Sequence, residues 1–325
     1  IIFIIFHGLS CFANDPIRSP NLLDLSQPNK NTWTISGLLH NEQDDYYGFM
    51  FIVERHHRLY HAYAGIFDLS DKKVLWHHEE TIRQDDNNSI PQNIGRFFWQ
   101  YSAVNDNLII GCQDVHNKQQ IFNLKIDLME PTVITPKMSL TPTIKLKQYW
   151  SGSINGHIHI SKEEFVSSQA VWIQNVWQNL ADVNPRSFSE ILCRFQDGGA
   201  MFAIQVTEKN GLHSALAGLY DKEGQRLTIS QFINLKTPEL PQYSIKLNQN
   251  KTELKLNALY ANQYYHAFLA NLNPEEPMGF CLYQKDPWEI FQSNTILFPN
   301  AKPVHSFNFF EKTFALIKKP YKIPY

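Results

Sequence analysis

Several histidines lie beside each other or beside carboxylates, where they could hold a metal ion or move a proton. His157 and His159 are two residues apart and would share one face of a strand, a spacing that can ligate a metal. No sequence feature nominates a third ligand, so we predict no metal site and expect solvated or hydrogen-bonded strand histidines. In the run HHEE, residues 77–80, each histidine would share a strand face with a glutamate. We expect an exposed strand end there, with an acid/base pair as the alternative.

The motifs of several enzyme classes are absent from the sequence. There is no glycine-rich phosphate loop between a strand and a helix, and no GxSxG nucleophile elbow. The four cysteines show neither zinc-ligand spacing nor a nucleophile arrangement with histidine. The net charge is −2 and no basic stripe occurs, which argues against nucleic acid as a partner. We therefore expect no cofactor.

Short strands must position any site in this chain. Segments rich in aromatic and β-branched residues recur along the sequence, and turn clusters such as DDNN (85–88) separate them. This pattern predicts an antiparallel all-β fold, with SKEEFVSS (161–168) as the best candidate for a short helix or linker turn. The predicted strands include 49–53, 72–79, 97–104, 107–112, 119–126, 170–177, 188–195, 200–206, 252–260 and 264–272.

One ten-residue segment occurs twice in similar form. Residues 59–68 read LYHAYAGIFD, and residues 212–221 read LHSALAGLYD, 153 positions later. Aligned without a gap, residues 49–68 and 202–221 share seven of twenty residues. A hairpin repeated once at this interval indicates an internal duplication rather than a many-bladed array. Each copy of about 150 residues has the size of a small closed barrel.

Strand alternation divides the repeated segment into two faces. Ala62 and Ala64 share a face on which three of five residue pairs are identical in the two copies, so this face should pack in the core. His61 and Tyr63 lie on the other face and occur only in the first copy. They are therefore candidate ligand-binding residues.

Several motifs resemble the hydroxyneurosporene synthase (carotenoid 1,2-hydratase)/AttH-like family in their order and spacing. TWTISGLL (32–39) and YYGFMFIVER (46–55) are similar to the family's tryptophan-glycine opening and its Tyr-Gly-Phe-Gln strand ending in Arg. LYHAYAGIFD is similar to its small-residue strand closing in Asp. AVWIQNVW (170–177) stands where the family has Ala-Trp-Leu-Asp-His-Glu-Trp. The resemblance extends to about residue 235 and implies two lipocalin-like β-barrels in tandem.

The resemblance also implies an apolar cavity, in which relatives hydrate or cyclise lipophilic substrates. Alkene hydration needs a general acid, because a proton must reach carbon. The family's Asp, His and Glu are Gln174, Asn175 and Val176 here, so that acid is lost from this strand. Tyr63 replaces another family histidine, and Met50 replaces the glutamine of the family's Tyr-Gly-Phe-Gln strand. The ligand-binding candidates are His61, Tyr63, Met50, Trp172, Gln174 and Trp177.

These replacements favour a protein that binds a lipophilic small molecule, such as an isoprenoid, a polyketide or a lipid, over an enzyme. The first alternative is a hydratase, lyase or cyclase with a relocated acid, for which His61 and Glu79 are candidates. The second alternative is a non-catalytic interaction module. A buried carboxyl or imidazole near Trp172 would favour the enzyme.

The first residues suggest export. IIFIIF followed by HGLSCFA resembles the end of a secretory signal peptide cleaved after Ala13, with a buried first strand as the alternative. The run is too short to span a membrane, so we expect a periplasmic or secreted protein without an integral span. Of the four cysteines, Cys11 could carry a lipid, and the other three allow one bridge. The predicted division is a signal remnant at 1–13, a first barrel at 14–165 and a second at 166–325.

Overall fold

The computed structural model describes most of the chain between residues 30 and 286. Within the described residues the chain forms strands and turns, and no helix long and apolar enough to cross a membrane is present. The predicted signal segment 1–13, with Cys11, lies outside them. The described ranges are 30–84, 91–102, 104–105, 107–114, 120–168, 171–178, 187–222, 226–230, 242–246, 253–271 and 278–286.

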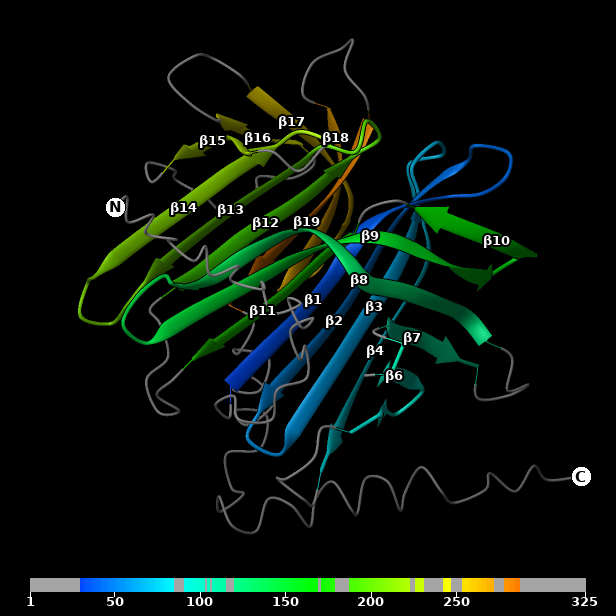
Figure 1. Ribbon diagram of the computed structural model, residues 1–325, viewed down its shortest axis with the longest axis horizontal. Helices are drawn as coiled ribbons and strands as arrows, with labels where there is room; N and C mark the ends of the chain where they lie inside the picture. Colours follow the sequence, from blue (N-terminus) through cyan, green and yellow to red (C-terminus); the bar gives the residue numbers. More distant parts are fainter. Residues whose placement is uncertain are drawn as a thin grey trace, which may run out of the picture.

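The first sheet has eleven antiparallel strands and curls into a nearly closed barrel (Figure 1). Its order is β4-β3-β2-β1-β10-β9-β8-β7-β6-β5, and β11 pairs with both β1 and β9. The strands are β1 (Lys30–His40), β2 (Tyr46–His56), β3 (Leu59–Asp68), β4 (Lys73–Arg83), β5 (Asn93–Ile94), β6 (Phe97–Ser102), β7 (Asn107–Gln113), β8 (Gln120–Ser139), β9 (Ile144–His159), β10 (Glu163–Ser168) and β11 (Val171–Gln178).

The second sheet has eight antiparallel strands in the order β15-β14-β13-β12-β19-β18-β17-β16. Both sheets therefore begin with four consecutive strands that pair in sequence order, and in both the first of these strands also pairs with a later one. The strands are β12 (Ser187–Phe195), β13 (Ala200–Thr207), β14 (His213–Tyr220), β15 (Arg226–Ser230), β16 (Gln242–Lys246), β17 (Glu253–Ala261), β18 (Tyr265–Asn271) and β19 (Met278–Lys285).

The all-β prediction is confirmed, and each strand predicted from the sequence is present. The prediction of a helix or linker turn at 161–168 is wrong. Glu163–Ser168 forms strand β10, whose residues pair with β9 from His159 back to Ile154. Strands up to β11 belong to the first sheet and strands from β12 onward to the second, and the division into barrels at 14–165 and 166–325 stays a prediction.

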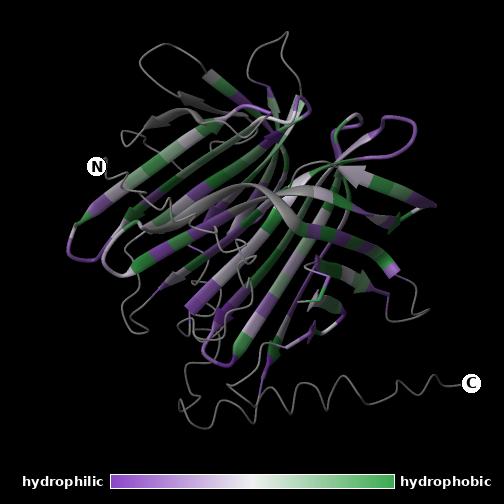
Figure 2. Ribbon diagram, viewed as in Figure 1, coloured by the Kyte–Doolittle hydropathy of each residue, from purple (hydrophilic) through white to green (hydrophobic). Residues whose placement is uncertain are grey.

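Strand alternation gives each sheet one face for its own core and one for the other sheet. In β2, Phe49 and Phe51 pack inside the first barrel, whereas Met50 and Ile52 pack against residues of the second sheet. Figure 2 shows hydrophobic residues along the strands and hydrophilic ones at the turns that join β2 to β3 and β13 to β14. The core therefore consists of separate clusters inside each sheet and between the sheets.

The repeated segment forms a hairpin in both sheets, but the two hairpins differ in register. Phe49 pairs with Ile66, while Phe202 pairs with Gly218 rather than with Leu219. The predicted packing face is confirmed, since Ala62 and Ala64 lie in the first core and Ala217 in the second. Phe202, however, faces the first sheet, whereas Phe49 faces its own core. The turns differ in length, so an ungapped alignment cannot fit both strands of the hairpin.

Gly48 gives the second sheet a place to approach the first. A Cβ atom at this position would lie 2.1 Å from Cδ2 of Phe280 in β19. The Phe280 ring stacks on Phe67 of β3, with ring centroids 5.5 Å apart. The glycine of the Tyr-Gly-Phe motif is thus explained by sheet packing.

We expect Gly48→Ala to lower the free energy of unfolding by about 1–3 kcal/mol, because the added methyl group must displace a packed ring. Denaturant titration would measure this loss. In the double variant with Phe280→Leu, the loss should be smaller than the sum of the two single losses. Additive losses would contradict direct packing between these two positions.

Candidate functional site

A row of polar side chains lies buried between the two sheets. Each is at most 1% exposed, and apolar clusters lie on both sides of the row. Polar groups at this depth require partners, so their arrangement is the first place to look for function. The first sheet contributes Thr34, Glu54, Gln148 and Gln174, and the second contributes Glu190, Tyr265 and Gln284.

Strand pairing brings these residues together although they are far apart in sequence. Thr34 pairs with Gln174, which pairs with Gln148 across β1, β11 and β9. On the second sheet, Gln284 pairs with both Glu190 and Tyr265. Each sheet thus presents one row of polar groups to the other.

Two chains of hydrogen bonds join the rows across the interface. Gln284 donates from Nε2 to Oε1 of Glu54 at 3.0 Å, and Thr34 donates to Oε1 of Gln284 at 3.5 Å. Gln148 donates to Gln174 at 2.8 Å, and the Gln174 amide donates in turn to the carboxyl of Glu190. Each chain therefore ends on a buried carboxyl.

Burial holds both carboxyls toward their neutral form. Desolvation raises the pKa of Glu190 to about 7, against a hydrogen bond from Gln174 that lowers it. Desolvation likewise raises the pKa of Glu54 well above its usual range, although Tyr265 and Gln284 act to lower it. A protonated carboxyl in a dry site can donate a hydrogen bond or a proton.

Glu54 is surrounded by polar atoms that lack hydrogen bonds of normal geometry among the described residues. Its own Oε2 is one of them, and its strand neighbours Thr32 and His61 each contribute another. The hydroxyls of Tyr63 and Tyr265 also lack hydrogen bonds of normal geometry, although Tyr265 interacts with the Glu54 carboxyl and Tyr63 with Tyr260. An unpaired buried polar group costs about 1–3 kcal/mol, so several near one carboxyl make this part of the interface the candidate site.

His61 is neutral in this site. Desolvation lowers its pKa to about 4, and its Nδ1 is hydrogen bonded to the Thr81 hydroxyl at 2.9 Å. Its Nε2 lies 3.6 Å from Oε2 of Glu79, whose side chain is 57% exposed. Because the imidazole is uncharged at neutral pH, this contact is not an ion pair. His61 is therefore a weak candidate for the relocated acid.

The predicted site residues separate into two groups. Met50, His61, Tyr63, Trp172 and Gln174 all lie on strand faces toward the second sheet. Trp177 alternates to the opposite face of β11, away from Trp172. Their roles in binding stay predictions.

Sequence reasoning missed the two carboxyls. Glu54 stands four residues after Met50 and therefore shares its face, and Glu190 interrupts the apolar strand FSEILCRF. Both signals were in the sequence. Glu190 occupies the neighbourhood of Gln174 from the other sheet, so an acid is present near Trp172 after all.

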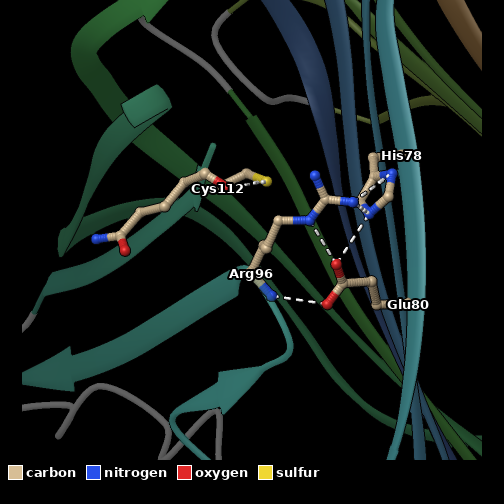
Figure 3. Close-up of polar contacts among 5 residues, drawn as sticks. His78, Glu80, Arg96 and Cys112 are labelled. Atoms are coloured by element: carbon tan, nitrogen blue, oxygen red, sulfur yellow. Dashed lines mark hydrogen bonds and ion pairs between the residues drawn. The ribbon is translucent and has the colours of Figure 1, made fainter. Parts of the chain in front are cut away.

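A second polar cluster lies in the first barrel (Figure 3). Glu80 accepts hydrogen bonds from Nε of Arg96 at 2.6 Å and from its backbone N–H at 2.7 Å, and it contacts His78 at 3.0 Å. Burial raises the pKa of the nearby Cys112 thiol to about 12, so this free cysteine stays protonated. The HHEE run is therefore not simply an exposed strand end, because His78 and Glu80 are half-buried and fix the turn before β6.

Gly95 is required by this cluster. It has φ +59°, and a Cβ there would lie 1.3 Å from Oε2 of Glu80. We expect Gly95→Ala to cost about 2–3 kcal/mol, through a left-handed backbone and the lost Glu80–Arg96 contacts. Gly211 has φ +86° with nothing within 4 Å of its Cβ position, so Gly211→Ala should cost about 1 kcal/mol. If denaturant titrations gave equal losses of unfolding free energy for Gly95→Ala and Gly211→Ala, the packing of Glu80 against Gly95 would be contradicted.

One disulfide joins Cys193 to Cys281 in the second sheet, where the two residues pair directly across β12 and β19. Both cysteines are buried in the core of that sheet. The backbone carbonyl of Cys193 also accepts a hydrogen bond from the Trp172 indole at 2.9 Å. The bridge therefore fixes the part of the second sheet that contacts Trp172.

Within the described residues, no group of three or more histidine, cysteine, aspartate or glutamate side chains could hold a metal ion. His157 instead lies 3.4 Å from Glu163 and packs edge-on against Phe165. His157 therefore has a partner within the first sheet, in β10.

No protein-family model matches the chain, and no curated protein matches its sequence. Solved structures do match it. An AttH-like protein from Nitrosomonas europaea is 14% identical, with a TM-score of 0.53, over 80% of this chain and 93% of that one. Kievitone hydratase from Nectria haematococca is 12% identical, with a TM-score of 0.56, over 80% of this chain and 90% of that one. The chain therefore has the lipocalin-like fold of AttH-like proteins that its sequence motifs resemble.

Proposed function

We propose that this protein binds an uncharged lipophilic small molecule between its two sheets, with its polar group at Glu54. The observation that carries the proposal is the set of buried, unpaired polar atoms around a neutral carboxyl, flanked by apolar clusters. Ligand sites typically combine apolar walls with a few polar groups that fix orientation. Such walls contribute roughly 25 cal/mol per Å² of apolar area buried.

The protonated Glu54 carboxyl would donate its O–H to an oxygen of the ligand. Gln284 already donates to Oε1, which leaves Oε2 for the ligand. Tyr63 and Tyr265 would turn their hydroxyls from Tyr260 and Glu54 to the same group, and burial raises the pKa of both, so they too remain neutral donors. We predict that Trp172 and Gln174 support the site from the neighbouring strand.

We further propose that the protein is exported. The Cys193–Cys281 disulfide supports this, because disulfides form and persist in oxidising compartments. Counting free thiols in protein taken from each cell fraction would test it. Protein found in the cytoplasm with three reduced thiols at 112, 193 and 281 would contradict export.

Binding is tested with the native protein and with one probe. Protein purified from its own host should release a lipophilic molecule on organic extraction, and native mass spectrometry should show the matching added mass. All-trans-retinol, an uncharged lipophile with one hydroxyl, serves as the probe in fluorescence titrations. Protein that is repeatedly empty and does not bind retinol would contradict the proposal.

Variants locate the probe. Glu54→Leu removes the donor and should weaken retinol binding about fivefold, the worth of roughly 1 kcal/mol for one hydrogen bond. Glu54→Gln keeps a neutral donor and should bind nearly as well as the wild-type protein. Glu163→Gln, at an exposed side chain on β10, is the matched control and should have no effect.

Acid catalysis in the same site is the second candidate function, favoured by the buried carboxyls near Trp172. Kievitone hydratase, which shares the fold, is by name a hydratase. Here the Glu54 proton would pass to an alkene carbon, water would add to the resulting cation, and its proton would return to the carboxylate. Incubation with an isoprenoid alkene in heavy water should then give a deuterated alcohol, and Glu54→Gln should lower its yield by about 10²-fold or more.

A further inference from the structure

A line of aromatic rings leads from solvent to Glu54. His77 on β4 is exposed, and its ring lies 4.9 Å from that of Tyr260 on β17. The Tyr63 ring lies 6.4 Å from His77, 6.1 Å from Tyr260 and 5.0 Å from Tyr265. Tyr265 in turn interacts with the Glu54 carboxyl. Exposure falls along this line from the exposed His77, through the half-buried Tyr260, to the buried Tyr63 and Tyr265.

The two strands that carry the outer pair belong to different sheets and do not pair with each other. Both are irregular at this point. In β4 the register shifts between Trp76 and Val74, directly beside His77, and in β17 it shifts between Ala258 and Tyr260. Bulges of this kind turn side chains to new directions and are frequent beside functional sites.

Side-chain contacts alone therefore close the seam between the sheets at His77 and Tyr260. No backbone ladder would have to break for these two rings to part. The Tyr260 hydroxyl accepts a hydrogen bond from Asn262 of its own segment at 3.3 Å and also interacts with the Tyr63 hydroxyl across the seam. Elsewhere in the described interface, hydrogen bonds such as Gln174 to Glu190 tie the sheets together. Because the seam at His77 and Tyr260 reaches solvent while the Gln174–Glu190 bond is buried, the seam is the more easily opened part.

We propose that His77 and Tyr260 form the gate through which a lipophilic ligand reaches Glu54, with Tyr63 as its inner leaf. This inference rests on the proposed binding function. The aromatic faces would stack on a planar or conjugated part of the ligand as it passes. The pair would then control how fast a ligand enters and leaves, rather than how tightly it is held.

Reversible cross-linking tests the gate. The double variant His77→Cys/Tyr260→Cys is treated with a short bis-methanethiosulfonate, which links two thiols and is removed by a reductant. Cys112 is buried and its thiol has a pKa of about 12, so it should not compete. Linking the empty protein should slow retinol uptake more than tenfold. Linking the loaded protein should slow retinol release by a similar factor, and the reductant should restore both rates.

The matched control is His157→Cys/Phe165→Cys. The rings of His157 and Phe165 have centroids 5.5 Å apart, and both residues lie in the first sheet, on β9 and β10. Its linkage should leave both rates unchanged. Singly substituted, alkylated variants control for the loss of each ring. If the linked gate variant takes up and releases retinol at the rates of these controls while the wild-type protein binds it, the gate is overturned and the site stands. If the wild-type protein binds no retinol and releases no ligand on extraction, both are overturned.

Discussion

The Glu190→Gln variant is expected to gain about 3 kcal/mol of stability relative to the wild-type protein as the pH rises from 4.5 to 7. The Glu190 pKa is about 7 in the folded protein, against an ordinary value of 4.5. The folded state therefore binds the proton more tightly, so the stability that Glu190 gives is complete below pH 4.5 and is lost as the pH rises through 7. Each pH unit in this window is worth about 1.4 kcal/mol.

Other buried groups oppose this effect in both proteins, so the expected gain is a difference between the variant and the wild-type protein. Burial lowers the pKa of both His56 and His61 to about 4, so their contributions rise with pH between about 4 and 6.5. Glutamine cannot ionise, but it keeps the contact with Gln174. The difference between the two proteins therefore reports the ionisation of the Glu190 carboxyl alone. Denaturant titrations at pH 4.5, 6, 7 and 8 would give the unfolding free energy of each protein as a curve against pH. Parallel curves across this range would show that Glu190 ionises without cost and would contradict its burial between the sheets.

The second large effect concerns the disulfide. Replacing Cys193 and Cys281 by alanine should lower the free energy of unfolding by about 4 kcal/mol, because the bridge closes a loop with a sequence separation of 88. The bridge restricts the conformations of the unfolded chain, and this loss of conformational entropy is the main source of the stabilisation. Loss of the bridge should also loosen the segment of β12 whose carbonyl holds Trp172.

Cys112→Ala is the control for this effect. It removes another buried cysteine but no bridge, so its cost should be about 1 kcal/mol. Thermal unfolding of the three proteins at one pH gives the comparison. A double variant that is no less stable than Cys112→Ala, or a wild-type protein in which Cys193 and Cys281 react as free thiols after unfolding, would contradict the bridge.

Alternation along single strands made the local structure predictable. The faces of Ala62 and Tyr63 follow from a period of two, and the structure places Ala62 in the core and Tyr63 between the sheets. Each predicted strand was a short apolar segment with turn residues at its ends. The segment 161–168 was missed because its polar residues suit an edge or partly exposed strand as well as a turn, and its pairing with β9 decided the outcome.

Long-range pairing could not be predicted in the same way. The loss of acidic residues around Gln174 suggested an inert site, because a single strand does not show what the opposite sheet contributes. Glu190 meets Gln174 from another sheet, and Glu54 meets Gln284 across a gap of 230 residues. The pairing of Cys193 with Cys281 likewise depended on β12 lying beside β19. Alternation shows which residues of one strand share a face but not which residues of another strand that face contacts.

Infrared difference spectroscopy at neutral pH tests most directly whether Glu54 is a protonated carboxyl that receives the ligand. We expect a carboxylic-acid C=O band in the wild-type protein that is absent in Glu54→Gln and shifts when retinol binds. Glu190→Gln should keep this band and its shift. A wild-type spectrum without the band, or a band that retinol leaves unmoved while the protein binds it, would show that Glu54 is not the protonated ligand-binding group.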